Sequence, residues 1–191
     1  MKNKLKVLVV TDIFGCCTSI SNLEKYLQSK CFDVMIVDPY KGIEQNFKNE
    51  NEAYNSFIKN CNHENYFKLI LKKQEYFEAD FIIGFSAGAN VVWRLSSFSF
   101  KNCKNIMSFY PTQIYKYQNI NPINSMHVIF PKEELKFEVG EVKENVQQKE
   151  KVTAEQLLYS HGFMNNLSPS YDKQAQKLGM RIINKIVGIK N

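Results

Sequence analysis

Ser86 lies at the centre of the stretch Gly-Phe-Ser-Ala-Gly, residues 84–88, and its hydroxyl is a candidate nucleophile. An apolar run precedes it at residues 81–83, and small and apolar residues follow at 89–97. These flanks predict a buried strand, a sharp turn and a helix. Such a turn needs glycine on both sides of the serine, because neighbouring backbone passes close to it. The pattern therefore predicts a nucleophile rather than an ordinary turn.

A serine hydroxyl is a weak nucleophile at neutral pH and needs a base within hydrogen-bonding reach. The chain has three histidines: His63, His127 and His161. His63 lies in a polar stretch and is predicted to be a surface or helix-capping residue. His127 stands at the start of an apolar strand and is predicted to be structural. His161 directly follows the last expected strand and is therefore the candidate base.

The elements that must position these groups can be read from the spacing of apolar residues. Strands are predicted at residues 5–10, 33–37, 81–83, 105–109, 126–130 and 155–159. Helices are predicted at residues 19–29, 66–77, 89–97 and 171–187, a loop plus a helix at 41–64, and no element in the polar, glutamate-rich stretch before Glu150. This alternation predicts an α/β fold with a mainly parallel sheet and helices on both faces.

In such a sheet, ligands bind beyond the carboxyl ends of the strands, where Ser86 and His161 are both expected. An acid must orient the imidazole and stabilise its cationic form. When these groups act on a sheet of this kind, the chain order is nucleophile, acid, histidine. The acid should therefore follow the strand at 126–130. Glu134 is the preferred candidate and Glu133 the second.

The composition predicts one soluble globular domain, residues 1–191, with 44% apolar and 23% charged residues. The net charge of +6 comes from lysines dispersed along the chain, which indicates a solvated surface and no nucleic-acid partner. No apolar run is long enough to cross a membrane, and no signal peptide is recognised. A cytoplasmic location is expected. The oligomeric state stays open.

The five cysteines predict neither a disulfide framework nor a zinc site, because their number is odd and no Cys-x-x-Cys spacing occurs. Phe14, Tyr110 and Phe163 fall near strand ends and are candidates to line an apolar pocket, or to belong to the core.

Four stretches, in order along nearly the whole chain, resemble the dienelactone hydrolase family of α/β-hydrolases. They are Val-Thr-Asp-Ile-Phe-Gly at 10–15, Val-Asp-Pro-Tyr at 37–40, the stretch 84–88, and His-Gly-Phe at 161–163 followed by Tyr171, Asp172 and Ala175. The resemblance implies an α/β-hydrolase fold in which Ser86 is the nucleophile and His161 the base. It also implies that the backbone N–H groups of Ala87 and Ile13 form the oxyanion hole.

Three features depart from the family pattern. Serine stands where the founding enzymes have cysteine, the acid is glutamate where aspartate is usual, and the chain is short, with an unusual segment at 41–64. Asp12 matches a family position where an acidic residue lies beside the nucleophile. Asp12 is interpreted here as a residue that caps the loop after the first strand.

The resulting hypothesis is a serine hydrolase that cleaves a small carboxylic ester, lactone or thioester through an acyl-enzyme, without metal or organic cofactor. One alternative is a hydrolase-fold protein that has lost catalysis and serves as a binding module. Another is a serine dipeptidase of glutamine-amidotransferase-like fold, which the stretch Ser-Ala-Gly-Ala-Asn at 86–90 also resembles. The dipeptidase would have to use His127.

Overall fold

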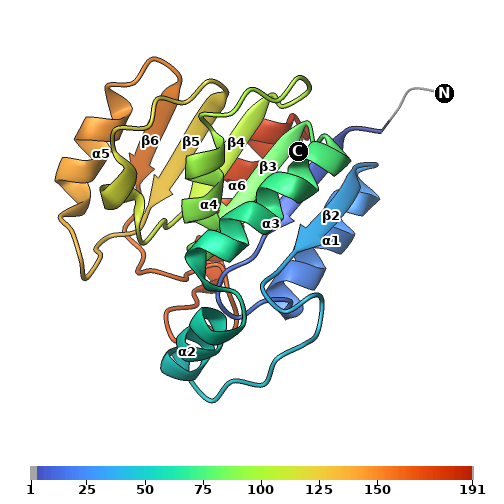
Figure 1. The fold of residues 1–191 in the computed structure, drawn as a ribbon, viewed down its shortest axis with the longest axis vertical. Helices are drawn as coiled ribbons and strands as arrows, with labels where there is room; N and C mark the ends of the chain where they lie inside the picture. Colours follow the sequence, from blue (N-terminus) through green and yellow to red (C-terminus); the bar gives the residue numbers. More distant parts are fainter. Residues whose placement is uncertain (1–3, 191) are drawn as a thin grey trace.

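A parallel sheet forms the centre of the computed structural model, which describes residues 4–190. Its strands are β1 (Lys6–Val10), β2 (Asp33–Val37), β3 (Phe81–Phe85), β4 (Asn105–Phe109), β5 (Ser125–Phe130) and β6 (Val152–Gln156). They lie in the order β2-β1-β3-β4-β5-β6 (Figure 1). The chain thus runs outward from β1 to β2 and then crosses back past β1 to β3. This reversal places the loops after β1 and β3 side by side at the carboxyl edge.

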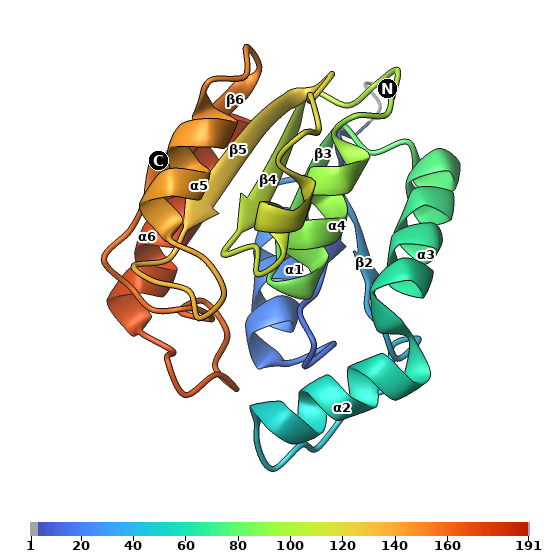
Figure 2. The same ribbon diagram turned by 60° about the vertical axis from the view of Figure 1, so that its left-hand side comes forward.

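Helices cover both faces of the sheet, as predicted. They are α1 (Thr18–Ser29), α2 (Glu50–Asn60), α3 (Asn62–Phe77), α4 (Ala87–Leu95), α5 (Val139–Gln147), α6 (Lys173–Val187) and the short 3-10 helix η1 (Ile114–Tyr117). Residues of α1 and α6 pack on one face, and those of α3, α4 and α5 pack on the other. Figure 1 shows α3 and α4 in front of the sheet, and Figure 2 shows α2 beyond the carboxyl ends of the strands.

The side chains of each central strand alternate between two apolar cores. In β1, Val7 and Val9 belong to the core under α1 and α6, whereas Leu8 and Val10 belong to the core under α3 and α4. Successive residues of a strand point to opposite faces, so a strand covered on both sides is apolar throughout. This is why the central strands could be predicted from continuous apolar runs.

The last strand lies earlier than predicted, at Val152–Gln156 rather than at residues 155–159. It is an edge strand, in which only Val152 and Ala154 are buried. An edge strand with one buried face needs few apolar residues. The apolar residues that follow it therefore lead to a predicted strand that lies too late in the chain. Leu157 and Tyr159 instead belong to the loop that leads to His161.

The glutamate-rich stretch before Glu150 contains a helix, α5, that was not predicted. Val139, Val142 and Val146 form its buried stripe and pack in the core beside β6. Most of its other residues are exposed, which hides the helical spacing in a polar composition.

Residues 41–64 form a loop followed by a helix, as predicted, but the second helix begins earlier than expected. α3 starts at Asn62 rather than at residue 66. The Asn49 side chain accepts a hydrogen bond from the Glu52 N–H at the start of α2. The asparagines make a helix in this segment hard to predict, yet some of them accept hydrogen bonds at helix starts. Within residues 4–190, no helix is long and apolar enough to cross a membrane.

Candidate active site

Ser86 occupies the sharp turn between β3 and α4. Its backbone has φ 49° and ψ −107°, a conformation that non-glycine residues rarely adopt. A Cβ atom at Gly84 would lie 2.6 Å from the Gly88 carbonyl oxygen, and one at Gly88 would lie 2.5 Å from the Thr11 carbonyl oxygen. Both glycines are therefore required by close backbone packing, as the sequence pattern predicts. The packing holds the strained serine against the end of β1.

His161 meets Ser86 across 75 residues of sequence. Its Nε2 atom lies 2.9 Å from Ser86 Oγ. The histidine sits in the loop after β6, and the next residue, Gly162, has a φ of 84°, which favours glycine. The Gly162 carbonyl accepts a hydrogen bond from the Asn165 N–H, and this turn fixes the loop at the carboxyl edge. Two groups that the sequence places far apart are thus within hydrogen-bonding distance.

Glu134 lies on the other side of the imidazole. Its Oε1 atom is 2.7 Å from His161 Nδ1, and its side chain is only 9% exposed. Glu133 is exposed, so the structure brings the first of the two candidate acids to the histidine. The Lys132 N–H donates to the Tyr159 carbonyl and joins the two loops that carry the acid and the histidine. With a proton on Nδ1 donated to Glu134, Nε2 is free to accept the Ser86 hydroxyl proton.

The two predicted oxyanion-hole residues lie beside Ser86. Ala87 is the first residue of α4, so its N–H is one of the free groups at a helix N-terminus. Neither the Ala87 nor the Ile13 N–H donates a hydrogen bond to any other residue in the described part of the chain. Ile13 lines a cavity of about 20 Å³ together with Ser86 and His161, which is room for about one water molecule. The two N–H groups thus belong to the residue that follows Ser86 and to a residue that lines the cavity beside it.

Asp12 is a buried carboxyl group at the edge of this cavity. Its Oδ1 accepts a hydrogen bond from the Phe14 N–H, which matches the loop-capping interpretation. Its Oδ2 accepts from Asn165 Nδ2 at 2.6 Å. Burial raises the pKa of Asp12 to about 6, although both hydrogen bonds and His161 favour the charged form. The sequence gives no signal for Asn165, because nothing near it marks a partner so distant along the chain.

The three aromatic candidates have different places. Phe14 lines the small cavity beside Ser86. Tyr110 packs edge-on against the His161 ring, with 5.0 Å between the ring centroids, and is almost fully buried. Phe163 also packs edge-on against Tyr110 and belongs to the core. The Tyr110 ring thus helps to hold the imidazole in place.

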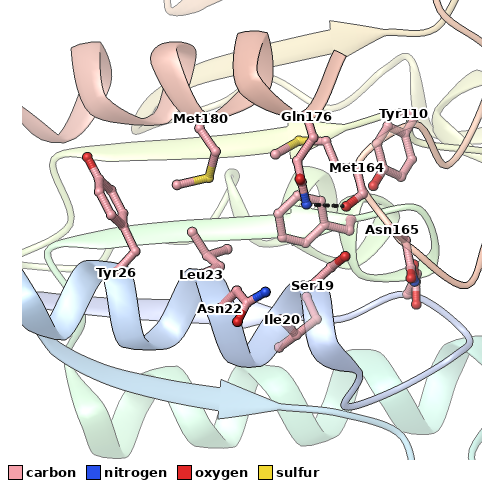
Figure 3. A pocket seen from close by; sticks show the side chains of 12 residues that line it. Ser19, Ile20, Asn22, Leu23, Tyr26, Tyr110, Met164, Asn165, Gln176 and Met180 are labelled. Carbon is pink, nitrogen blue, oxygen red and sulfur yellow. Dashed lines mark hydrogen bonds between the residues drawn. The ribbon is translucent and has the colours of Figure 1, made fainter. Parts of the chain in front are cut away.

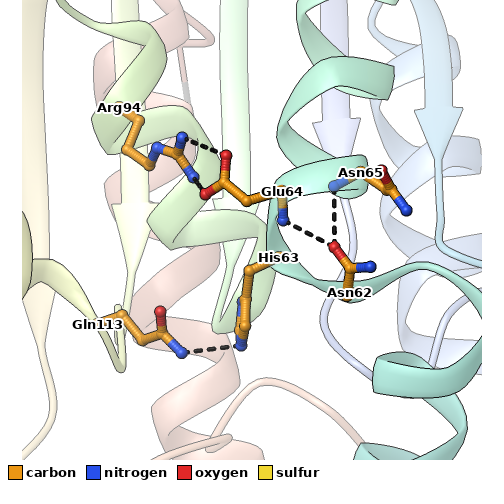
Figure 4. A network of polar contacts seen from close by, with 6 residues as sticks. All are labelled: Asn62, His63, Glu64, Asn65, Arg94 and Gln113. Atoms are coloured by element: carbon orange, nitrogen blue, oxygen red, sulfur yellow. Dashed lines mark hydrogen bonds and ion pairs between the residues drawn. The ribbon is translucent and has the colours of Figure 1, made fainter.

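The other two histidines do not reach Ser86. His127 is bonded to Asn105 Oδ1 near the amino ends of β4 and β5, at the opposite edge of the sheet. This position removes the support for the dipeptidase alternative. His63, near the start of α3, bonds to the Gln113 side chain (Figure 4). It is half-buried, and it is the side chain of its neighbour Asn62 that accepts hydrogen bonds from the Glu64 and Asn65 N–H groups in the first turn of α3.

Residues 4–190 contain no group of three or more His, Cys, Asp or Glu residues placed to hold a metal ion. The chemistry that the site's own residues can supply is acid, base and nucleophile chemistry. The site places a hydroxyl, an imidazole and a carboxylate in one hydrogen-bonded row, with two free N–H groups nearby.

No family model and no curated protein sequence matches the chain. Solved structures do match its fold. A Klebsiella pneumoniae protein assigned as a dienelactone hydrolase aligns over 100% of this chain and 89% of its own, with a TM-score of 0.69 and 13% sequence identity. A dienelactone hydrolase-like promiscuous phosphotriesterase from metagenomic libraries aligns over 95% of this chain and 84% of its own, with a TM-score of 0.69 and 15% identity.

A lipase-esterase related protein from Clostridium acetobutylicum aligns over 96% of this chain and 95% of its own, with a TM-score of 0.61 and 13% identity. At such identities the likeness establishes the fold alone. The chain has a dienelactone hydrolase-like α/β-hydrolase fold, as the sequence resemblance implies.

Proposed function

We propose that this chain is a serine hydrolase that cleaves a small carboxylic ester, lactone or thioester through an acyl-enzyme. The hydrogen-bonded row of Ser86, His161 and Glu134 is the observation that supports this most. A serine, a base and an orienting acid in one row are what nucleophilic acyl transfer requires. The α/β-hydrolase fold is consistent with this chemistry but does not by itself establish it.

In the acylation step, Ser86 Oγ attacks the carbonyl carbon of the substrate while His161 Nε2 takes the hydroxyl proton. Glu134 accepts the hydrogen bond from Nδ1 and stabilises the imidazolium. The negative charge on the carbonyl oxygen is met by the N–H groups of Ala87 and Ile13 and by the positive end of α4. Collapse of the intermediate breaks the bond to the leaving group, which receives the proton from His161.

Deacylation repeats these steps with water. His161 takes a proton from a water molecule, the hydroxide attacks the acyl carbon, and Ser86 leaves with the returned proton. No metal or cofactor takes part in this scheme. The small cavity at Ser86 suits a compact reacting group, and a small ester, lactone or thioester is the partner we propose. We also propose a cytoplasmic location, since all five cysteines are unpaired.

A fluorophosphonate probe tests the proposal, because it phosphonylates only activated serines. We expect the folded protein to be labelled at Ser86 and to hydrolyse p-nitrophenyl acetate. Ser86→Ala should lose labelling and lower kcat by about a million-fold, since it removes the nucleophile. Ser97→Ala is the matched control, because Ser97 lies just past the end of α4 and its hydroxyl donates to the Arg94 carbonyl.

The same measurements can overturn the proposal. Equal turnover by wild type and Ser86→Ala, or labelling that persists in Ser86→Ala, would favour the alternative of a hydrolase-fold binding protein without catalysis. Intact-protein mass spectrometry and circular dichroism would confirm that each variant is folded and carries one label at most.

A further inference from the structure

A second cavity in the described part of the chain is larger than the one at Ser86. It has a volume of about 180 Å³ and lies between α1 and α6, on the face of the sheet opposite α4 (Figure 3). Buried Phe85 and Tyr110 at the ends of β3 and β4 belong to its lining. Asn22 of α1 is exposed and Gln176 of α6 is half-buried, so these two amides stand at its rim. The cavity therefore has aromatic and apolar side chains inside, a buried Asp12–Asn165 pair on one wall, and amides at its entrance.

A pair of side chains separates this cavity from Ser86. Asp12 lines both cavities, and its Oδ2 is bonded at 2.6 Å to Asn165, which lines only the larger one. The pair is buried and each partner makes further hydrogen bonds, Asp12 with the Phe14 N–H and Asn165 with the Leu167 N–H. The wall is thus well anchored, and the larger cavity is a separate compartment.

The lining indicates the chemistry of an occupant. Among the described residues, no lysine, arginine or histidine lines the cavity, and Asp12 is its one ionisable carboxyl group, so an anionic molecule would find no cationic partner there. Met164 and Met180 face the space together with aromatic rings (Figure 3). Thioether sulfurs make favourable contacts with aromatic rings. A buried cavity of about 150 Å³ is enough to bind benzene.

We propose that the cavity between α1 and α6 is a binding site for an uncharged monocyclic aromatic molecule that carries one hydrogen-bonding substituent. The ring would lie between Met164, Met180 and Tyr110, and its substituent would reach the amides at the rim. This site is distinct from the acyl-transfer position and does not depend on whether Ser86 is a nucleophile. Tyr110 is shared by the two sites, since it lines this cavity and its ring packs against His161.

Binding can be measured with benzyl alcohol as the probe and the labelled methyl groups of the methionines as reporters in NMR spectra. We expect saturable shifts of the Met164 and Met180 signals, with a dissociation constant in the millimolar range. Met126 lies in the core on the opposite face of the sheet and should not shift. Benzoate, which has a carboxylate in place of the alcohol, should bind at least about tenfold more weakly.

Two variants of α6 locate the site. Met180→Trp fills the cavity and should weaken benzyl alcohol binding about tenfold or more. Lys177→Trp places the same side chain on an exposed position of the same helix and should bind as the wild type does. Ser86→Ala should also bind normally, which separates this proposal from the hydrolase proposal.

Several results would overturn the proposal. They are the absence of saturable shifts at both methionines, equal binding by Met180→Trp, or benzoate binding as tightly as benzyl alcohol. Loss of binding in Ser86→Ala would also overturn it, because the alcohol would then occupy the small cavity beside Ser86 instead.

Discussion

Two histidines occupy the same edge of the sheet, and their surroundings differ in one decisive way. His161 stands between a carboxylate and a hydroxyl, 2.7 Å from Glu134 and 2.9 Å from Ser86. His63 lies 2.8 Å from the amide of Gln113 and packs edge-on against Phe57. Both are partly buried and both are hydrogen-bonded. Only His161 has an acid on one ring nitrogen and a candidate nucleophile on the other.

The charged groups near His63 differ from those near His161. Burial lowers the pKa of His63, and nearby Lys116 and Arg94 lower it further. Arg94 is itself paired with Glu64, so that carboxylate is directed to the guanidinium rather than to the imidazole (Figure 4). These surroundings favour the neutral form of His63, which links α3 to the loop after β4 through Gln113. A histidine at the carboxyl edge of a sheet is therefore suited to act as a base only where a carboxylate stabilises its cationic form.

The largest expected effect comes from the same substitution at both histidines. His161→Gln should lower kcat for p-nitrophenyl acetate by about a thousand-fold to a million-fold, because an amide cannot take the serine proton. His63→Gln should change kcat by less than about threefold, because its ring does not touch the reacting groups. Steady-state turnover checks this. A comparable loss in both variants would break the comparison.

A smaller effect is expected from the acid. Glu134→Gln keeps the side-chain size but removes the charge that stabilises the imidazolium, so kcat should fall by about a hundred-fold to ten-thousand-fold. Glu133→Gln is the matched control, because Glu133 precedes Glu134 in the chain and is exposed, and this variant should act as the wild type does. If the control loses as much activity as Glu134→Gln, the assignment of the acid is wrong.

The smallest effect concerns the contribution of Asp12, near His161, to the free energy of unfolding. The pKa of Asp12 rises from 3.8 to about 6 on folding, so between these values the folded state holds a proton that the unfolded state has lost. Stability should therefore fall as the pH rises through this window, by at most about 3 kcal/mol from this group. Asp12→Asn should lack that contribution.

Urea unfolding of the wild type and of Asp12→Asn at about pH 4.5 and about pH 6.5 measures this contribution. It is the difference between the two proteins in how much the free energy of unfolding changes from the lower to the higher pH. Parallel pH dependence in wild type and Asp12→Asn would mean that Asp12 keeps its ordinary pKa when buried.

Much of the fold could be predicted because local sequence carries it. A central strand covered on both faces must be apolar throughout, and the turn at Ser86 must have Gly84 and Gly88 because backbone atoms approach both positions. The same reasoning fails at the periphery. β6 and α5 each bury one narrow face, so their composition is polar and their limits do not stand out.

The sequence by itself determined the α/β alternation, the strained serine turn and the histidine that follows the last strand, since each rests on residues close together in the chain. Only the tertiary structure shows that Glu134 rather than Glu133 lies beside His161, because this depends on how the loops after β5 and β6 are joined. It alone placed Asn165 against Asp12, 153 residues away, and opened the cavity between α1 and α6. Contacts of this range arise from packing, which no local pattern encodes.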